Sequence, residues 1–122
     1  MSVVEVNAEN WEQEVLQSET LVLVDFWHDR CPWCIRQNPI YDELAAEYPG
    51  QMKFVKLNIL AKPENQPIAV MYGVRGTPTL MFFCDGRPVE TIVGFQPKDR
   101  LKQTLDDMLA MHRECIQQST KL

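Results

Sequence analysis

The stretch "LVLVDFWHDRCPWCIRQNP", residues 21–39, decides the fold of this chain and most of its chemistry. Its first seven residues are nearly all apolar, which is typical of a central strand buried on both faces. The segment from about Cys31 to Tyr48 is predicted to be a helix bent at Pro39, because proline removes a backbone donor in mid-helix. Cys31 and Cys34 therefore stand where a buried strand gives way to a helix.

The remaining segments alternate between strand-like and helix-like patterns, without an internal repeat or a linker. Further strands are expected at 3–6, 52–59, 79–84 and 88–94, and further helices at about 8–17, at 64–72 and from Pro97 onward. The turn Asp85-Gly86 between two apolar runs predicts a hairpin. The order βαβαβαββα predicts an α/β fold in which helices flank both faces of a central mixed sheet.

Two of these helices have a recognisable apolar face. Asn7 is placed to cap the first helix, in which Trp11 and Val15 lie four positions apart on one side. The last helix carries a longer stripe that is expected to face the sheet: Leu101, Leu105, Met108, Leu109 and Ile116.

The length of 122 residues fits one domain with one core, and 45% apolar with 24% charged residues is ordinary globular composition. A formal net charge of −5 without any Lys/Arg block gives no support to nucleic-acid binding. The N-terminal residues lack the basic and apolar regions of a secretory signal, and no apolar run approaches the ~20 residues of a membrane span. We therefore expect a cytoplasmic protein that binds neither nucleic acid nor membrane.

Three kinds of site place two cysteines two residues apart: a metal clamp, a structural disulfide and a working redox pair. A metal site needs about four ligands, whereas only Cys31, Cys34 and His28 lie close together and no second C-x-x-C follows. A disulfide over so short a loop is worth only ~2 kcal/mol on the entropic model, and the cytosol is reducing. We therefore expect a redox pair that uses neither a metal nor a bound cofactor.

Thiol–disulfide exchange requires a thiolate, since the neutral thiol is a poor nucleophile. Cys31 is predicted to open a helix, where unpaired backbone N–H groups and the positive end of the helix dipole lower the pKa of a thiol. Cys34 would lie one turn further along, close enough to resolve a mixed disulfide. Cys31 is thus the candidate nucleophile and Cys34 the candidate resolving cysteine.

Four motifs resemble those of the thioredoxin family, in the same order and at similar spacing. They are "VDFW" at 24–27, the C-x-x-C that opens a helix with a proline five residues further on, "VKLN" at 55–58 and "YGVRGTPTLMFF" at 72–83. The resemblance implies a thioredoxin fold over residues 1–110, with 111–122 as a helical tail that has no counterpart. It also implies a monomeric protein-disulfide reductase in electron transport and cell redox homeostasis, which receives electrons from a thioredoxin-reductase-type donor and acts on disulfide-containing proteins.

The resemblance further suggests roles for residues outside the cysteine pair. Asp25 matches the general base that deprotonates Cys34, with a pKa raised by burial and moderated by Lys56. The alternative is a strand-end aspartate held by backbone N–H groups. Substrate-binding positions implied by the resemblance are Trp33, Arg75, Gly76, Thr77, Pro78 with a cis peptide bond, and Gly94, whose lack of a side chain permits close approach. For Trp33, the alternative is that it simply covers the helix end.

The dipeptide between the two cysteines departs from the Gly-Pro usual in the family and is more similar to glutaredoxins. Pro32 removes an amide donor beside Cys31, whereas Trp33 supplies one that a Gly-Pro loop lacks. Hydrogen bonds to the thiolate lower its pKa and stabilise the reduced form, so we expect a potential less reducing than the roughly −270 mV of thioredoxin. The alternative is no measurable shift. Glutaredoxin-like or oxidase/isomerase-type exchange, or a thioredoxin-scaffold binding module, remain alternative functions.

Two further cysteines, Cys84 and Cys115, lie far from the pair in sequence. Cysteines of this kind are more often reduced and incidental than bridged, and we expect the same here. Whether their Cα atoms come within the ~7 Å that a disulfide requires does not follow from the sequence.

Overall fold

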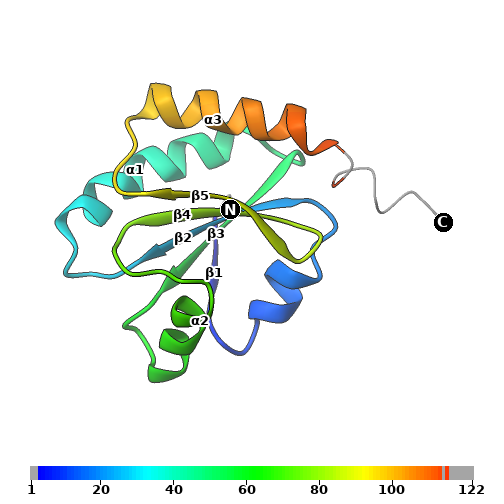
Figure 1. Cartoon of the computed structure of the whole chain (residues 1–122). Helices are drawn as coiled ribbons and strands as arrows, with labels where there is room; N and C mark the ends of the chain where they lie inside the picture. Colours follow the sequence, from blue (N-terminus) through cyan, green and yellow to red (C-terminus); the bar gives the residue numbers. More distant parts are fainter. Residues whose placement is uncertain (1–2, 114, 116–122) are drawn as a thin grey trace.

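Five strands form one mixed sheet in the computed structural model, which describes residues 3–113 and 115 (Figure 1). They are β1 (Val3–Val6), β2 (Leu21–Trp27), β3 (Met52–Asn58), β4 (Thr79–Cys84) and β5 (Arg87–Val93). The spatial order is β1-β3-β2-β4-β5, with β1 and β2 parallel to β3, and β4 antiparallel to both β2 and β5. The predicted α/β fold, parallel in its first part and antiparallel at its end, is confirmed.

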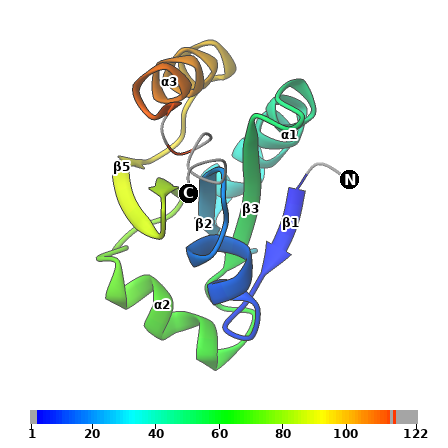
Figure 2. The same cartoon turned by 90° about the vertical axis from the view of Figure 1, so that its right-hand side faces the viewer.

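Helices cover both faces of this sheet. They are a short helix of π type, η1 (Glu12–Leu16), then α1 (Pro32–Glu47), a 3₁₀ turn η2 (Pro63–Asn65), α2 (Gln66–Met71) and α3 (Lys98–Met111). Helices α1 and α3 lie together on one face, and α2 lies with η1 on the other (Figures 1 and 2). This agrees with the predicted arrangement of helices on two faces.

The first helix is shorter than predicted, because the chain before it closes a separate turn. The side-chain oxygen of Asn7 accepts hydrogen bonds from the amides of Glu9, at 2.8 Å, and of Asn10, at 3.3 Å. Regular helix therefore does not extend over 8–17, although Asn7 does cap the turn as its type suggests. Trp11 and Val15 are both buried, as their spacing predicts.

Alternation along the strands divides the core into two layers, since successive side chains point to opposite faces. One layer joins Leu23 of β2 and Phe54 of β3 to α1 and α3, and the other joins Val24 and Val55 to α2 and η1. In the predicted stripe of α3, Leu101, Leu105 and Met108 are buried and Leu109 is partly buried, whereas Ile116 lies outside the described residues. Helix α3 ends at Met111, just beyond the predicted boundary at residue 110.

Three loops meet at one end of the sheet, on the left of Figure 1. Phe26, near the end of β2, pairs with Thr79 at the start of β4, and Thr79 pairs with Val93 at the end of β5. The loops that follow β2, precede β4 and follow β5 are thus neighbours. At the other end, the predicted hairpin turn has positive φ at Asp85 (56°) and Gly86 (79°), as this tight turn demands.

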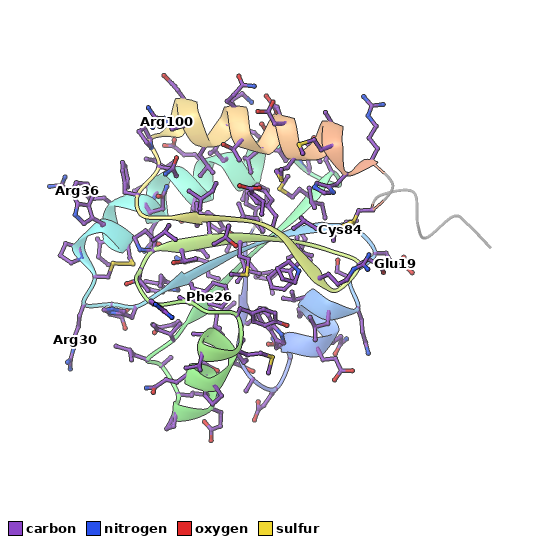
Figure 3. The ribbon with its side chains drawn as sticks, viewed as in Figure 1. Glu19, Phe26, Arg30, Arg36, Cys84 and Arg100 are labelled. Atoms are coloured by element: carbon purple, nitrogen blue, oxygen red, sulfur yellow. A yellow bond between two sulfur atoms is a disulfide. The ribbon has the colours of Figure 1, made fainter. Side chains whose placement is uncertain are left out.

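Cys84 and Cys115 form a disulfide, so the expectation that they are reduced is wrong in this structure. Their Cα atoms are 5.7 Å apart and both side chains are buried. The disulfide joins the last residue of β4 to the segment just beyond α3, at the end of the sheet opposite the three loops (Figure 3).

Candidate active site

Cys31 and Cys34 form a disulfide at the start of α1, with their Cα atoms 5.1 Å apart. Cys31 is the N-cap residue in an extended conformation, and Pro32 occupies the first helical position, which needs no amide donor. The amide of Cys34 donates a hydrogen bond of 3.1 Å to Cys31 Sγ. The Cys31 sulfur thus already accepts a hydrogen bond from the helix N-terminus, as a thiolate at this position would.

The two sulfur-bearing side chains differ in exposure. Cys31 retains 7% of its accessible surface, whereas Cys34 retains none. Figure 3 shows the neighbouring Arg30 projecting from the end of the molecule where this disulfide lies. An external thiol or disulfide can therefore reach Cys31 and not Cys34.

Asp25 lies on the same side of β2 as Leu23, the side covered by α1. It is fully buried, and neither carboxylate oxygen has a hydrogen-bond partner among the described residues. Burial raises its pKa from 3.8 to about 7, while the positive charge of Lys56 acts in the opposite direction. No backbone N–H of a described residue donates to this carboxylate, so the alternative of an aspartate held by such groups is not supported.

The position of Lys56 explains its effect on this carboxyl. Lys56 pairs with Asp25 in the β2–β3 register and is only 8% exposed. Its ammonium lies 4.4 Å from the centre of the Trp27 ring, which provides a cation–π contact in a partly buried place. Trp27 therefore holds the cation that lowers the pKa of Asp25.

The peptide bond Thr77–Pro78 is cis. The carbonyl of Pro78 accepts a hydrogen bond of 2.8 Å from the amide of Gly94, which joins the loops before β4 and after β5. Gly94 has a φ of 97°, and a Cβ there would meet nothing within 4 Å. Within the protein itself, glycine is thus favoured by backbone conformation and not by close packing.

A hollow of about 340 Å³ lies beside these loops, and we call it the Trp33–Phe95 groove. It is lined by Trp33, Thr77, Pro78, Gly94 and Phe95. The Trp33 side chain is 52% exposed, and its ring centre lies 5.4 Å from that of Phe95. Four of the six predicted substrate-binding residues thus come together in one hollow. The fifth lining residue, Phe95, was not predicted.

Comparison with known proteins supports one assignment. The thioredoxin family model matches residues 2–107. Thioredoxin 1 of Synechococcus elongatus is 48% identical over 81% of this chain and 90% of its own length. The thioredoxin of Pseudomonas aeruginosa is 44% identical over 85% and 94%, and the chloroplastic M-type thioredoxin of Pisum sativum is 42% identical over 83% and 57%. The chain belongs to the thioredoxin family. It is accordingly a thiol–disulfide oxidoreductase that reduces protein disulfides through Cys31 and Cys34.

Two predicted positions of this thioredoxin do not line the groove. Arg75 and Gly76 are both exposed and precede the cis peptide bond. The carbonyl of Gly76 accepts a hydrogen bond of 2.6 Å from the hydroxyl of Thr79, which closes the turn around the proline.

His28, beside the cysteine pair in the sequence, accepts a hydrogen bond from the amide of Arg30. No group of three or more His, Cys, Asp or Glu within 3–113 and 115 is arranged to hold a metal ion.

Two residues of the site were not identified from the sequence. Phe95 follows Gly94 directly, and an aromatic residue beside a loop glycine was the available signal. Gln37 is fully buried on α1, one turn after Cys34. Its signal was a polar residue in the apolar stripe of a helix, at three and four positions from Cys34 and Tyr41.

Proposed function

We propose that this thioredoxin reduces its clients by attack of the Cys31 thiolate, with Cys34 as the resolving cysteine and Asp25 as its general base. The observation that carries the proposal is the asymmetry of the disulfide. Cys31 keeps some exposed surface, and its sulfur accepts a hydrogen bond from the Cys34 amide at a helix N-terminus. Cys34 is fully buried on the side of the sheet where Asp25 lies.

In the first step, the Cys31 thiolate attacks one sulfur of a client disulfide. A mixed disulfide forms, the client S–S bond breaks, and one client sulfur leaves as a thiolate. The helix N-terminus and the Cys34 amide favour the charged form of Cys31 before the attack. A segment of the client chain lies in the Trp33–Phe95 groove, and its backbone pairs with Thr77 beside the cis peptide bond.

In the second step, Asp25 takes the proton of the Cys34 thiol, and the resulting thiolate attacks Cys31 Sγ. The Cys31–Cys34 disulfide forms and the second client sulfur leaves as a thiolate, which takes up a proton. Two electrons thus pass from the protein to the client. Asp25 suits this role because burial brings its pKa to about 7 while Lys56 keeps the charged form attainable.

Recovery of the dithiol requires an electron donor, for which we propose a reductase of the thioredoxin-reductase type. We further propose a monomer that acts in the cytoplasm, in electron transport and redox homeostasis, without binding to nucleic acid or membrane. The acidic charge of −5 supports the absence of nucleic acid, and no helix within the described ranges is long and apolar enough to span a membrane. The chloroplastic relatives make a fractionation experiment in the source cell the direct test of location.

The roles of the two cysteines are tested by trapping. Cys34→Ser should accumulate a mixed disulfide with oxidised insulin, because the resolving thiol is missing, whereas Cys31→Ser should accumulate none. Non-reducing electrophoresis and mass spectrometry of the linked peptide identify the sulfur involved. A trapped complex through Cys34 in the Cys31→Ser protein would contradict the proposal.

A further inference from the structure

Gln37 is a fully buried polar side chain on the helix that carries both active-site cysteines. It makes two hydrogen bonds with the backbone of one residue in another loop. Its Nε2 donates to the carbonyl of Gln96 at 3.1 Å, and its Oε1 accepts from the amide of Gln96 at 2.8 Å. The side-chain amide thus pairs with a peptide unit in the way that a neighbouring strand would.

The backbone of residues 94–96, which includes the Gln96 peptide unit bound by Gln37, has few other hydrogen-bond partners. Strand β5 ends at Val93, and Pro97 follows Gln96 without an amide hydrogen. On the other side of Phe95, the Gly94 amide donates to the carbonyl of Pro78. Residues 94–96 are therefore held at both ends, at the first by the cis-proline loop and at the last by α1.

Phe95 lies between these two tethers and forms one wall of the Trp33–Phe95 groove. Its ring meets that of Trp33 with the planes tilted by 45°. On its own helix, Trp33 also lies 4.8 Å from the guanidinium of Arg36 (labelled in Figure 3). The position of the Phe95 wall relative to Cys31 thus depends on the tether that Gln37 provides.

We propose that Gln37 is a positioning residue for client binding: it fixes residues 94–96 so that Phe95 and Trp33 together receive an apolar client side chain beside the attacked disulfide. This inference rests on the proposed function, since it assumes that clients enter this groove. An apolar residue of similar size at position 37 would fill the same space but leave the amide and the carbonyl of Gln96 without partners. The loop would then shift to find other partners, and the Phe95 wall would move with it.

The test uses two cyclic peptides, each closed by one disulfide and identical except for Leu or Ser directly before the first cysteine. Single-turnover reduction by the pre-reduced protein gives a maximal rate constant and a half-saturating concentration for each peptide. The natural protein should prefer the Leu peptide through a lower half-saturating concentration. Gln37→Leu should raise that concentration by about fivefold or more and leave the maximal rate constant and the Ser peptide almost unchanged.

A double-mutant cycle distinguishes positioning from a general structural role. If Gln37 acts through Phe95, then Gln37→Leu should have no further effect in a Phe95→Ala background. Gln103→Leu provides the matched control, because it makes the same replacement on the exposed face of α3, and should behave as the natural protein. Thermal unfolding of each variant reports any general loss of folding.

Five outcomes decide the matter. The proposal is supported if Gln37→Leu loses the Leu preference in the natural protein and has no further effect in the Phe95→Ala background. Additive effects of the two replacements, or equal effects on both peptides, overturn it. An unchanged Leu preference in Gln37→Leu overturns it as well, while the proposed function stands. If the natural protein reduces neither peptide, the proposed function itself fails and the inference fails with it.

Discussion

Asp25 lies in an environment that disfavours its own charged form. A carboxylate without hydrogen-bond partners in an apolar layer is costly, and proteins usually avoid it by pairing or by protonation. Here the cost persists because Lys56, held over Trp27, offsets only part of it. A group balanced in this way changes its proton occupancy near neutral pH, which suits a group that must take up and release protons.

Replacement of this carboxyl should slow the resolving step. In Asp25→Asn, the release of client from the mixed disulfide is expected to slow by about tenfold or more at pH 7, since general-base catalysis typically contributes 10²–10⁴-fold. The inflection near pH 7 in the rate should disappear. Stopped-flow fluorescence of the reduced protein with oxidised insulin, from pH 5 to 9, measures both effects.

Lys56→Gln provides the control for this profile. Because Lys56 lowers the pKa of Asp25, its removal should move the inflection to higher pH without abolishing it. An inflection that survives in Asp25→Asn would assign the titration to another group.

Asp25→Asn, which should slow the resolving step, should raise stability at neutral and higher pH. The folded-state pKa of Asp25 is raised from 3.8 to about 7, so the folded chain binds this proton more tightly than the unfolded chain between those pH values. Stability therefore falls as the pH rises from about 4 to 7, by about 4 kcal/mol at 1.36 kcal/mol per pKa unit. Asp25→Asn should be more stable than the natural protein at pH 8 and no more stable at pH 3, as urea unfolding at both pH values will show.

At the scale of the elements, the junction of β2 with α1 fixes the reactive sulfur. The register places the start of β4 and the end of β5 beside it, so one helix end and two loops form the site. The dipeptide Pro32-Trp33 is the part of this junction that departs from the usual family loop. Its proline fits the first helical position, and the ring of its tryptophan packs against that of Phe95.

Exchange of this dipeptide should shift the reduction potential. With Pro32→Gly and Trp33→Pro combined, the chain gains an amide at residue 32 and loses the one at residue 33, and we expect a potential more negative by about 40 mV. Equilibration with glutathione buffers, followed by alkylation and mass spectrometry of the active-site peptide, measures it. Trp33→Ala keeps the amide and removes the ring, so it should stay near the natural value. A shift in Trp33→Ala as large as in the double variant would trace the effect to the ring instead.

The sequence predicted elements well where one local pattern sufficed. The apolar run of β2, the helix opened by Cys31 and the Asp-Gly hairpin each depend on neighbouring residues, and each is present. The first helix was overestimated because the Asn7 side chain closes a competing turn, which periodicity does not reveal. Gln37 was missed because its side chain bonds to the backbone of Gln96, 59 residues away. Phe95 was missed because its ring meets that of Trp33, which lies on another element.

At the scale of the whole molecule, the two disulfides lie at opposite ends of the sheet. Cys31–Cys34 lies at the end where β2 stops, and Cys84–Cys115 at the end where β4 stops (Figure 3). This second pair was not expected because two cysteines 31 residues apart meet only through the packing of α3 on the sheet. The proposed boundary between a domain at 1–110 and a tail at 111–122 remains a prediction, although the bridge crosses it.

Removal of the second bridge should lower stability without affecting exchange. For a closed loop of about 30 residues, the entropic model gives a contribution of about 4 kcal/mol. Cys84→Ser combined with Cys115→Ser should therefore unfold at lower guanidinium concentration than the oxidised natural protein. The insulin reduction rate should stay the same, since both residues are remote from Cys31.

Reducing conditions supply the control. With excess dithiothreitol in both samples, the stability difference between the natural protein and the double serine variant should largely vanish. Alkylation of Cys84 and Cys115 in the folded, air-oxidised natural protein would contradict the bridge.

The separation of the two pairs also affects electron counting. Each disulfide accepts two electrons, so a fully reduced chain holds four, of which the proposed exchange passes only the two at Cys31 and Cys34 to a client. A titration of total thiols would then give twice the capacity that one client turnover consumes. Stoichiometry for this protein is therefore meaningful only when each cysteine peptide is quantified separately.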